Sequence, residues 1–167
     1  MECTKAHMNN KCHTLEFVDT LPEEVEEKMR KDLVEYENNH GIDVNYKRFT
    51  IILRDEKREV LGVLNAFTAF SEVFIDDMWV YKPFRGKGYG EKLLQALENH
   101  FKGKGFNNIN LVKSAFSAPG FYKKCGFTVE FVRENKKNPK LTKTFFIKYF
   151  DEEIQTQGIL KKENGCS

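Results

Sequence analysis

The organising element of this chain reads Arg85-Gly86-Lys87-Gly88-Tyr89-Gly90. It follows a strand-like run over residues 72–80 and opens a helix-like run over residues 91–101. Glycines let backbone N–H groups come close to a ligand, a helix N-terminus adds positive dipole, and Arg85 and Lys87 add charge. The alternative is a tight turn whose glycines only permit positive φ angles. Alternate glycines interleaved with cations at a helix start favour a phosphate site.

Length and composition indicate an ordinary globular protein. At 167 residues, with 40% hydrophobic and 31% charged residues, the chain is expected to form one domain over residues 1–167. Residues 1–11 and 151–167 are polar and are expected to be flexible tails. A net charge of +2 gives no reason to expect a nucleic-acid or membrane partner. The chain shows no apolar run of membrane length and no signal-peptide pattern, so we expect a cytoplasmic protein.

The cysteine pattern predicts neither disulfides nor a metal site. The four cysteines are Cys3, Cys12, Cys125 and Cys166. They contain no CxxC pair, so reduced thiols are expected. Cys3 and Cys12 with His7 and His13 match the spacing of no common zinc module, so no bound metal is predicted.

Hydrophobic periodicity predicts an α/β (α+β) fold. Strands are expected at residues 14–18, 49–53, 60–67, 72–80, 106–112, 127–132 and 144–150, and helices at 21–39, 91–101 and 119–124. Thr20 is the expected cap of the first helix. The order is β-α-β-β-β-α-β-α-β-β. This order predicts a mixed, mostly antiparallel sheet of about seven strands with helices on both faces, in which strands 72–80 and 106–112 are parallel neighbours.

Common nucleotide motifs do not fit the glycine turn. No Gly-Lys-Ser/Thr follows it, so it is not a P-loop. The dinucleotide fingerprint also fails, because the glycines alternate and residues 106–108, about twenty residues on, hold no acid.

Three motifs resemble the GNAT superfamily of acetyl-CoA-dependent N-acetyltransferases. Arg85-x-x-Gly88-x-Gly90 is similar to the superfamily's arginine/glutamine-x-x-Gly-x-Gly/Ala signature. Met78-Trp79-Val80 stands where those enzymes carry an apolar-aromatic-valine triplet. Ala118-x-x-Phe121-Tyr122-x-Lys124-x-Gly126-Phe127 resembles their second signature. One departure is Ala115, where many members have Asn.

The resemblance implies a GNAT-like fold that binds acetyl-CoA. Backbone N–H groups of Arg85, Gly86, Lys87, Gly88, Tyr89 and Gly90 would bind the pyrophosphate of coenzyme A. The pantetheine arm would run beside Met78, Trp79 and Val80, where strands 72–80 and 106–112 splay apart. Lys124 is a further candidate contact to a cofactor phosphate.

The resemblance also implies catalytic roles. Tyr122 matches the family's general acid for the departing thiolate, and its alternative role is an aromatic residue packed on a short helix. An alkylamine with a pKa near 10.4 is protonated at neutral pH, so a base is useful. Residues 74–80 resemble the spermidine/spermine acetyltransferases, in which an acid at the position of Asp76 serves the acceptor. Because adjacent strand residues face opposite ways, at most one of Asp76 and Asp77 is expected in a given site, with Glu72 on the face of Asp76.

The expected function is N-acetyl transfer from acetyl-CoA to a primary amine of a small cationic molecule or a protein. The acceptor pocket would lie between residues 21–47 and 133–143. A non-catalytic acyl-CoA-binding or regulatory module on the same fold is the alternative from another class. The sequence leaves open the acceptor, the identity of the base and whether the protein is a homodimer.

Overall fold

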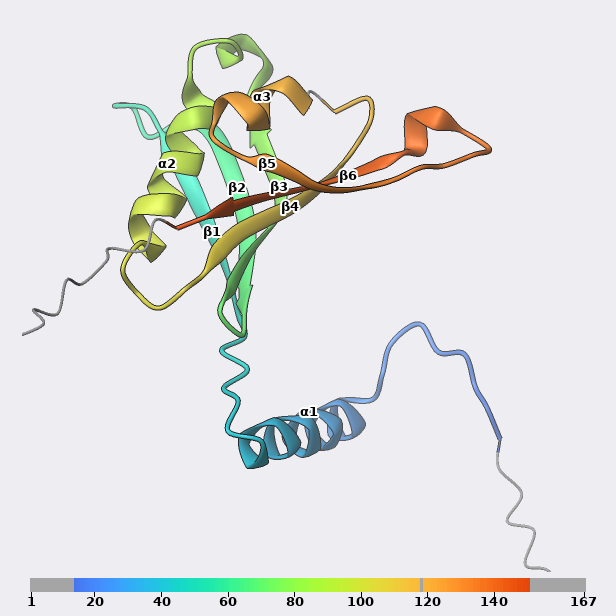
Figure 1. Cartoon of the computed structure of the whole chain (residues 1–167). Helices are drawn as coiled ribbons and strands as arrows, with labels where there is room; N and C mark the ends of the chain where they lie inside the picture. The colour runs from blue at the N-terminus through green and yellow to red at the C-terminus, as the bar shows by residue number, and fades with distance from the viewer. Residues whose placement is uncertain (1–13, 118, 151–167) are drawn as a thin grey trace, which may run out of the picture. The chain divides into compact units, whose positions relative to one another are not determined.

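The computed structural model describes residues 14–117 and 119–150 (Figure 1). It divides into two compact units, one ending at Ile42 and the other beginning at Asp43, and each is described by itself. The prediction of a single domain therefore stays a prediction. The expected tails lie outside the described residues, as do Ala118, the zinc alternative at positions 3–13, and Cys166.

Over its described residues, 14–42, the first unit contains one helix, α1 (Glu23–Asn39). It begins two residues later than predicted because Pro22 has φ −57° and ψ 136° and serves as the N-cap residue. The Pro22 carbonyl accepts hydrogen bonds from the N–H groups of Val25 and Glu26, each at 3.0 Å. Thr20 is therefore not the cap. The strand predicted at residues 14–18 is absent, since this segment pairs with no neighbour and two alternating apolar residues cannot hold a strand without a partner.

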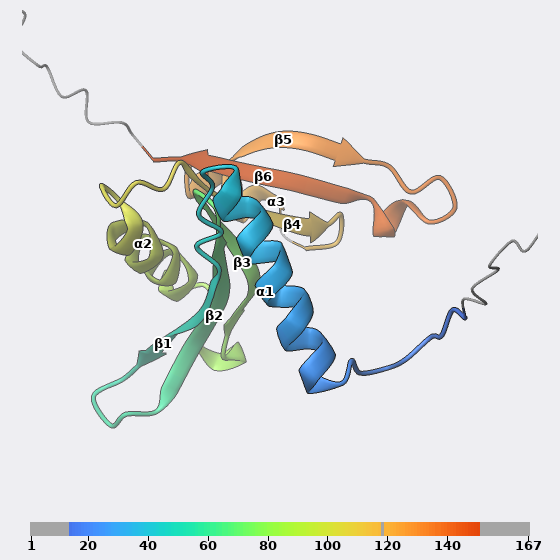
Figure 2. The same cartoon turned by 90° about the horizontal axis from the view of Figure 1, so that it is seen from below.

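The second unit is built on a six-stranded sheet with the order β1-β2-β3-β4-β6-β5 (Figure 2). Its elements are β1 (Lys47–Arg54), β2 (Val60–Ala69), β3 (Glu72–Val80), η1 (Lys82–Phe84), α2 (Tyr89–Phe101), β4 (Asn108–Ser114), α3 (Pro119–Lys124), β5 (Thr128–Arg133), η2 (Pro139–Leu141) and β6 (Lys143–Tyr149). The predicted mixed, mostly antiparallel fold is confirmed, with six strands instead of about seven.

One hydrophobic core joins the sheet to both α2 and α3. Leu93, Leu94, Leu97 and Phe101 of α2 are buried against β1, β2 and β3. Tyr122 of α3 belongs to the same core and packs against Phe146, with ring centroids 5.6 Å apart. Both α2 and α3 pack into this one core. The expectation that helices cover both faces of the sheet therefore stays a prediction.

A glycine in β2 sets how closely α2 approaches the sheet. A Cβ atom at Gly62 would lie 3.0 Å from the Trp79 carbonyl oxygen and 3.1 Å from a methyl carbon of Leu93. Both distances are shorter than ordinary van der Waals contact, so the close packing of helix and sheet requires glycine here.

The parallel pair β3 and β4 separates halfway along its length, as the sequence resemblance implied. Their register runs from Glu72–Asn108 to Ile75–Leu111 and goes no further. After Leu111, β4 stays paired with β6, and after Ile75, β3 stays paired with β2. The second half of β3 therefore has an open side, and this opening positions the site.

Within residues 14–117 and 119–150, no helix combines the length and the apolar character needed to cross a bilayer.

Candidate active site

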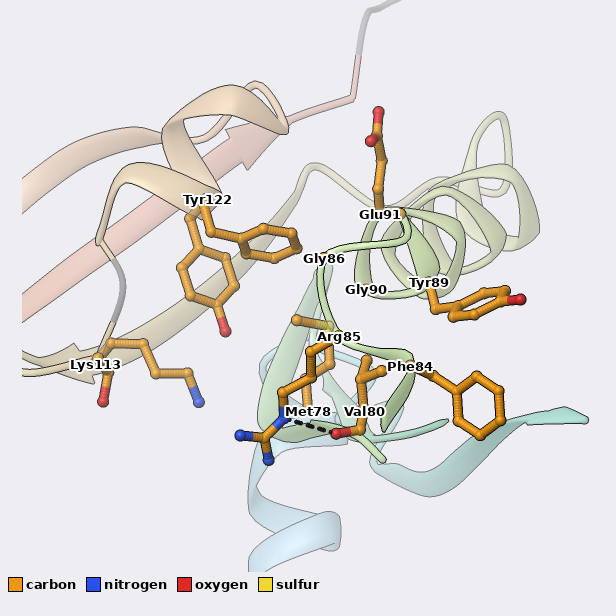
Figure 3. A pocket seen from close by; sticks show the side chains of 13 residues that line it. Met78, Val80, Phe84, Arg85, Gly86, Tyr89, Gly90, Glu91, Lys113 and Tyr122 are labelled. Carbon is orange, nitrogen blue, oxygen red and sulfur yellow. Dashed lines mark hydrogen bonds between the residues drawn. The ribbon is translucent and has the colours of Figure 1, made fainter. Parts of the chain in front are cut away.

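A cavity of about 530 Å³ lies where β3 and β4 separate (Figure 3). Its walls come from the end of β3, the glycine turn, the first residues of α2, the end of β4 and α3. The lining residues are Met78, Val80, Phe84, Arg85, Gly86, Gly88, Tyr89, Gly90, Glu91, Lys113, Ser117, Phe121 and Tyr122. The cavity thus brings together the three motifs that the sequence placed in separate segments.

The glycine turn forms one wall of this cavity. Gly86 and Gly88 have φ values of 75° and 80°, a conformation that glycine adopts without strain. Gly88 is the N-cap residue of α2 and accepts a hydrogen bond from the Lys92 N–H at 3.0 Å. The N–H groups in the first turn of a helix have no partner within the helix, so those beside Gly90 are available to an anion.

The Arg85 side chain is fixed at the start of the glycine turn by a hydrogen bond. Its Nε donates a hydrogen bond of 3.0 Å to the Val80 carbonyl oxygen, drawn as the dashed line in Figure 3. This bond ties the turn to the end of β3 and leaves the two terminal nitrogens of the guanidinium group for a ligand.

A third requirement for glycine appears at Gly90. A Cβ atom there would lie 3.0 Å from Cζ of Phe121 and 3.6 Å from Cε of Met78. The absence of a side chain at Gly90 therefore lets the Phe121 ring of α3 pack against the start of α2.

Three predicted cofactor contacts do not line the cavity with their side chains. Trp79 is exposed on the other face of β3 and packs against Tyr81, with centroids 5.9 Å apart. The Lys87 ammonium lies 5.2 Å from the centre of the Phe84 ring, and Lys124 is exposed on α3.

The backbone of Met78 and Val80 faces the open side of β3. The Tyr81 N–H donates to the Leu61 carbonyl at 2.9 Å. In an antiparallel ladder the hydrogen-bonded pairs alternate, so Trp79 also bonds toward β2, whereas Met78 and Val80 point away from it. The bond from Arg85 to the Val80 carbonyl agrees with this direction. Since β4 has already separated, the Met78 N–H is available to a bound molecule.

Tyr122 places a phenol in the cavity. Its residue is only 5% exposed and packs against Phe121, Phe127 and Phe146, while its hydroxyl extends into the cavity (Figure 3). Burial, with a smaller contribution from Cys125, raises the pKa of Tyr122 to about 12. The phenol therefore keeps its proton at neutral pH and acts as a donor.

Sequence reasoning missed several residues of the wall, among them Lys113, Ser117 and Glu91. Lys113 was visible in principle, because it continues the alternate row of Ile109 and Leu111 in β4. A cation at the end of an apolar row is unusual. The sequence alone, however, does not show where β4 separates from β3, so it could not place Lys113 in a cavity. Ser117 lies in a loop without periodicity and gave no such signal.

Asp76 lies away from this cavity. It lines a separate hollow of about 260 Å³, together with Arg48, Phe49, Thr50, Asn65, Ala66 and Asp77. Asp76 Oδ2 accepts a hydrogen bond from the Arg48 guanidinium at 2.9 Å. Within the described residues, Asp77 takes part in no ion pair. The next residue, Met78, lines the cavity of Tyr122, so β3 contributes to both hollows.

The expectation that only one of Asp76 and Asp77 faces a given site was wrong. Asn65 pairs with Asp77 and Ala66 with Ile75, so Asp76 is an extra residue inserted at a β-bulge. A bulge shifts the alternation of side chains by one residue, and both carboxylates therefore line the same hollow. Glu72 is held elsewhere, because its carboxylate accepts hydrogen bonds from Asn108 and Asn110 at 3.0 and 3.3 Å.

Ala115, the residue that departs from the family pattern, lies outside the cavity. The N–H of Ala115 donates to the Thr142 carbonyl at 2.8 Å. In the part of the chain that the structure describes, no cluster of three or more His, Cys, Asp or Glu residues could hold a metal ion.

Solved structures of acetyltransferases share this fold. An acetyltransferase from Bacillus cereus ATCC 14579 is 24% identical, with a TM-score of 0.64 over 80% of this chain and 97% of that chain. The ribosomal-protein-S18-alanine N-acetyltransferase of Escherichia coli is 16% identical, with a TM-score of 0.56 over 74% and 81% of the two chains. A spermidine/spermine N-acetyltransferase from Vibrio cholerae is 17% identical, with a TM-score of 0.51 over 71% and 74%. At these identities the likeness establishes the fold.

The family itself is shown by the sequence. Residues 11–127 match the model of the acetyltransferase (GNAT) family, which is more than half of the chain, so the chain belongs to this family. It is an acyltransferase, and its family uses acetyl-CoA. A comparison with curated proteins finds no match.

Proposed function

We propose that this enzyme transfers an acetyl group from acetyl-CoA directly to a primary amine. The observation that carries the proposal is the cavity in which a helix N-terminus, the open edge of β3 and the Tyr122 hydroxyl meet. The turn around Gly88 would hold the pyrophosphate, and the Met78 carbonyl and the Val80 N–H, which point away from β2, would pair with the pantetheine arm. The thioester would then lie between β3 and Tyr122.

The chain's own groups supply two of the needs of acyl transfer. When an amine attacks the thioester, the Met78 N–H is the donor for the negatively charged oxygen of the tetrahedral intermediate. As the carbon–sulfur bond breaks, Tyr122 is the general acid that donates toward the departing thiolate. Its buried ring fixes the direction of the hydroxyl.

The hollow lined by Asp76 and Asp77 is the proposed binding site for the acceptor amine. Asp76 and Asp77 give it two carboxylates, which suit a cationic amine. One oxygen of Asp76 is occupied by Arg48, whereas Glu72 is held by two asparagines of β4. We assign the base to this carboxylate pair, with Asp76 as the residue that the resemblance indicates.

The acceptor class is a primary amine on a small cationic molecule or a protein. Among proteins of this fold, one is named for spermidine and spermine and another for a ribosomal protein's alanine. A panel of polyamine, aminoglycoside-like, amino-acid and peptide amines, with thiol release as the readout, tests the proposal. If the protein binds acetyl-CoA but no amine raises thiol release above the rate without acceptor, the proposed reaction is wrong.

Two sets of variants separate the roles. Tyr122→Phe should lower kcat about a hundredfold and change the KM for acetyl-CoA less than about threefold. Asp76→Asn and Asp77→Asn should raise the KM of cationic amines and leave acetyl-CoA binding intact. Glu56→Gln, a matched change of an exposed acid between β1 and β2, is the control. Equal loss of turnover and acetyl-CoA binding in Tyr122→Phe would show a purely structural role.

A further inference from the structure

Lys113 occupies a position where its neighbours in the same row are apolar. Side chains alternate along β4, and Ile109 and Leu111 are 1% and 2% exposed in the core. Lys113 is next in that row, two residues after the last pairing of β4 with β3. Its backbone is still paired with Thr144 of β6, so the strand fixes where the side chain begins.

The lysine side chain extends into the cavity from the same side as Tyr122 (Figure 3). The other charged residues of the wall are Arg85 from the turn and Glu91 from α2. Arg85 is tied to the end of β3, and the Glu91 side chain extends away from the turn in Figure 3. Within the described residues, Lys113 makes no ion pair or side-chain hydrogen bond. Lys113 is thus a half-buried residue whose ammonium has no partner among the described residues.

The reaction proposed above creates an anion in this part of the cavity. When the carbon–sulfur bond breaks, the electron pair stays on sulfur, and a thiolate forms beside Tyr122. Burial raises the pKa of Tyr122 to about 12, so the phenol keeps its proton until the sulfur has become basic. Negative charge therefore develops on the sulfur before Tyr122 transfers its proton, and a nearby cation stabilises this charge.

We infer that the Lys113 ammonium stabilises the thiolate of coenzyme A as it leaves, which makes Lys113 a catalytic residue. The inference rests on the proposed acetyl transfer and adds a residue to it. Tyr122 donates a hydrogen bond to the same sulfur. The amine nitrogen loses one proton on becoming an amide and the thiolate finally gains one, so the reaction stays balanced with Lys113 charged throughout.

The decisive measurement is the pKa of the thiol of coenzyme A bound to the full-length protein. Ultraviolet absorbance of the thiolate reports it, and the affinity of coenzyme A relative to its desulfo analogue gives it independently. A positive charge beside sulfur stabilises the thiolate, so the bound thiol should titrate about one pH unit below the free thiol. Above that pH, coenzyme A should gain up to about tenfold in affinity over desulfo-coenzyme A.

Three variants make the measurement specific. Lys113→Met should abolish the shift, and Lys113→Arg should keep most of it because the charge remains. Lys143→Met is the matched control, since Lys143 is exposed on β6 and does not line the cavity. With an active acceptor, Lys113→Met should lower kcat about tenfold with little change in the KM for acetyl-CoA.

Each outcome decides one claim. If coenzyme A binds but the thiol pKa is equal in wild type and Lys113→Met, the role of Lys113 is refuted and the proposed acetyl transfer stands. If Lys113→Met weakens coenzyme A and its desulfo analogue equally, Lys113 binds another part of the molecule and the inference is also refuted. If wild-type protein binds no coenzyme A, the proposed function itself fails.

Discussion

Gly90 offers a direct test of the geometry of the site. The substitution Gly90→Ala places a methyl carbon 3.0 Å from the edge of the Phe121 ring and 3.6 Å from the Met78 side chain. Carbon atoms in contact ordinarily lie about 3.5–4.0 Å apart, so the ring must move by roughly half an ångström or more. Phe121 and Met78 both line the cavity, and the movement narrows the proposed path of the pantetheine arm.

Two opposing effects set the stability of this variant. Overpacking typically costs about 1–3 kcal/mol, while replacing glycine by alanine within a helix contributes up to about 1 kcal/mol. We therefore expect a net destabilisation of about 0–2 kcal/mol, measured by urea denaturation. If the ring moves into the cavity, the stability cost falls and the binding cost rises, so acetyl-CoA affinity should fall at least about tenfold, or roughly 1.4 kcal/mol.

Gly120→Ala is the matched control for this variant. Gly120 lies in α3 next to Phe121, and a Cβ atom there would meet no atom within 4 Å. This variant should be as stable as wild type or slightly more stable, with unchanged acetyl-CoA affinity by calorimetry. The reasoning is refuted if Gly90→Ala binds acetyl-CoA like wild type and is also no less stable.

Further predictions concern pH and packing. Burial raises the pKa of Tyr122 from 10.0 to about 12, so its contribution to stability is complete below pH 10 and is lost as the pH rises from 10 toward 12. Denaturation at both ends of this range should show a smaller alkaline loss for Tyr122→Phe, and an equal loss would contradict the assignment. Gly62→Ala should lower the free energy of unfolding by about 1–3 kcal/mol, because its methyl meets the Trp79 carbonyl, a backbone atom that cannot rotate away. Lys148 Nζ lies 2.6 Å from Glu98 Oε2. Lys148→Met should therefore lower the free energy of unfolding by about 1–3 kcal/mol in urea denaturation, because it leaves the Glu98 carboxylate without its partner. Adding Glu98→Leu should restore part of this loss, and no recovery would show that the ion pair contributes nothing.

The sequence predicted most of the sheet because each strand carries its own pattern. Residues 72–80 were predicted with the bounds that β3 has, and α3 coincides with the predicted helix at 119–124. The strand predicted at residues 14–18 was wrong because its formation depends on residues outside the segment. A strand depends on a partner, and local alternation cannot show that none is present.

The glycine turn was determined locally as well. The positive φ angles of Gly86 and Gly88, and the helix that begins at Tyr89, follow from the residues themselves. The turn was therefore predicted as an anion site before any neighbour was known, although binding by its backbone remains to be tested.

The tertiary structure alone decided what surrounds that turn. Pairing with Asn65 and Ala66 creates the bulge that places Asp76 beside Asp77, and no alternation rule applied to β3 alone could show it. The separation of β3 from β4 turns an apolar row into a cavity wall and places Lys113 in it. The motifs within one segment were thus determined by the sequence itself. The carboxylate pair and the cation depend on pairing between distant strands, which only the folded chain establishes.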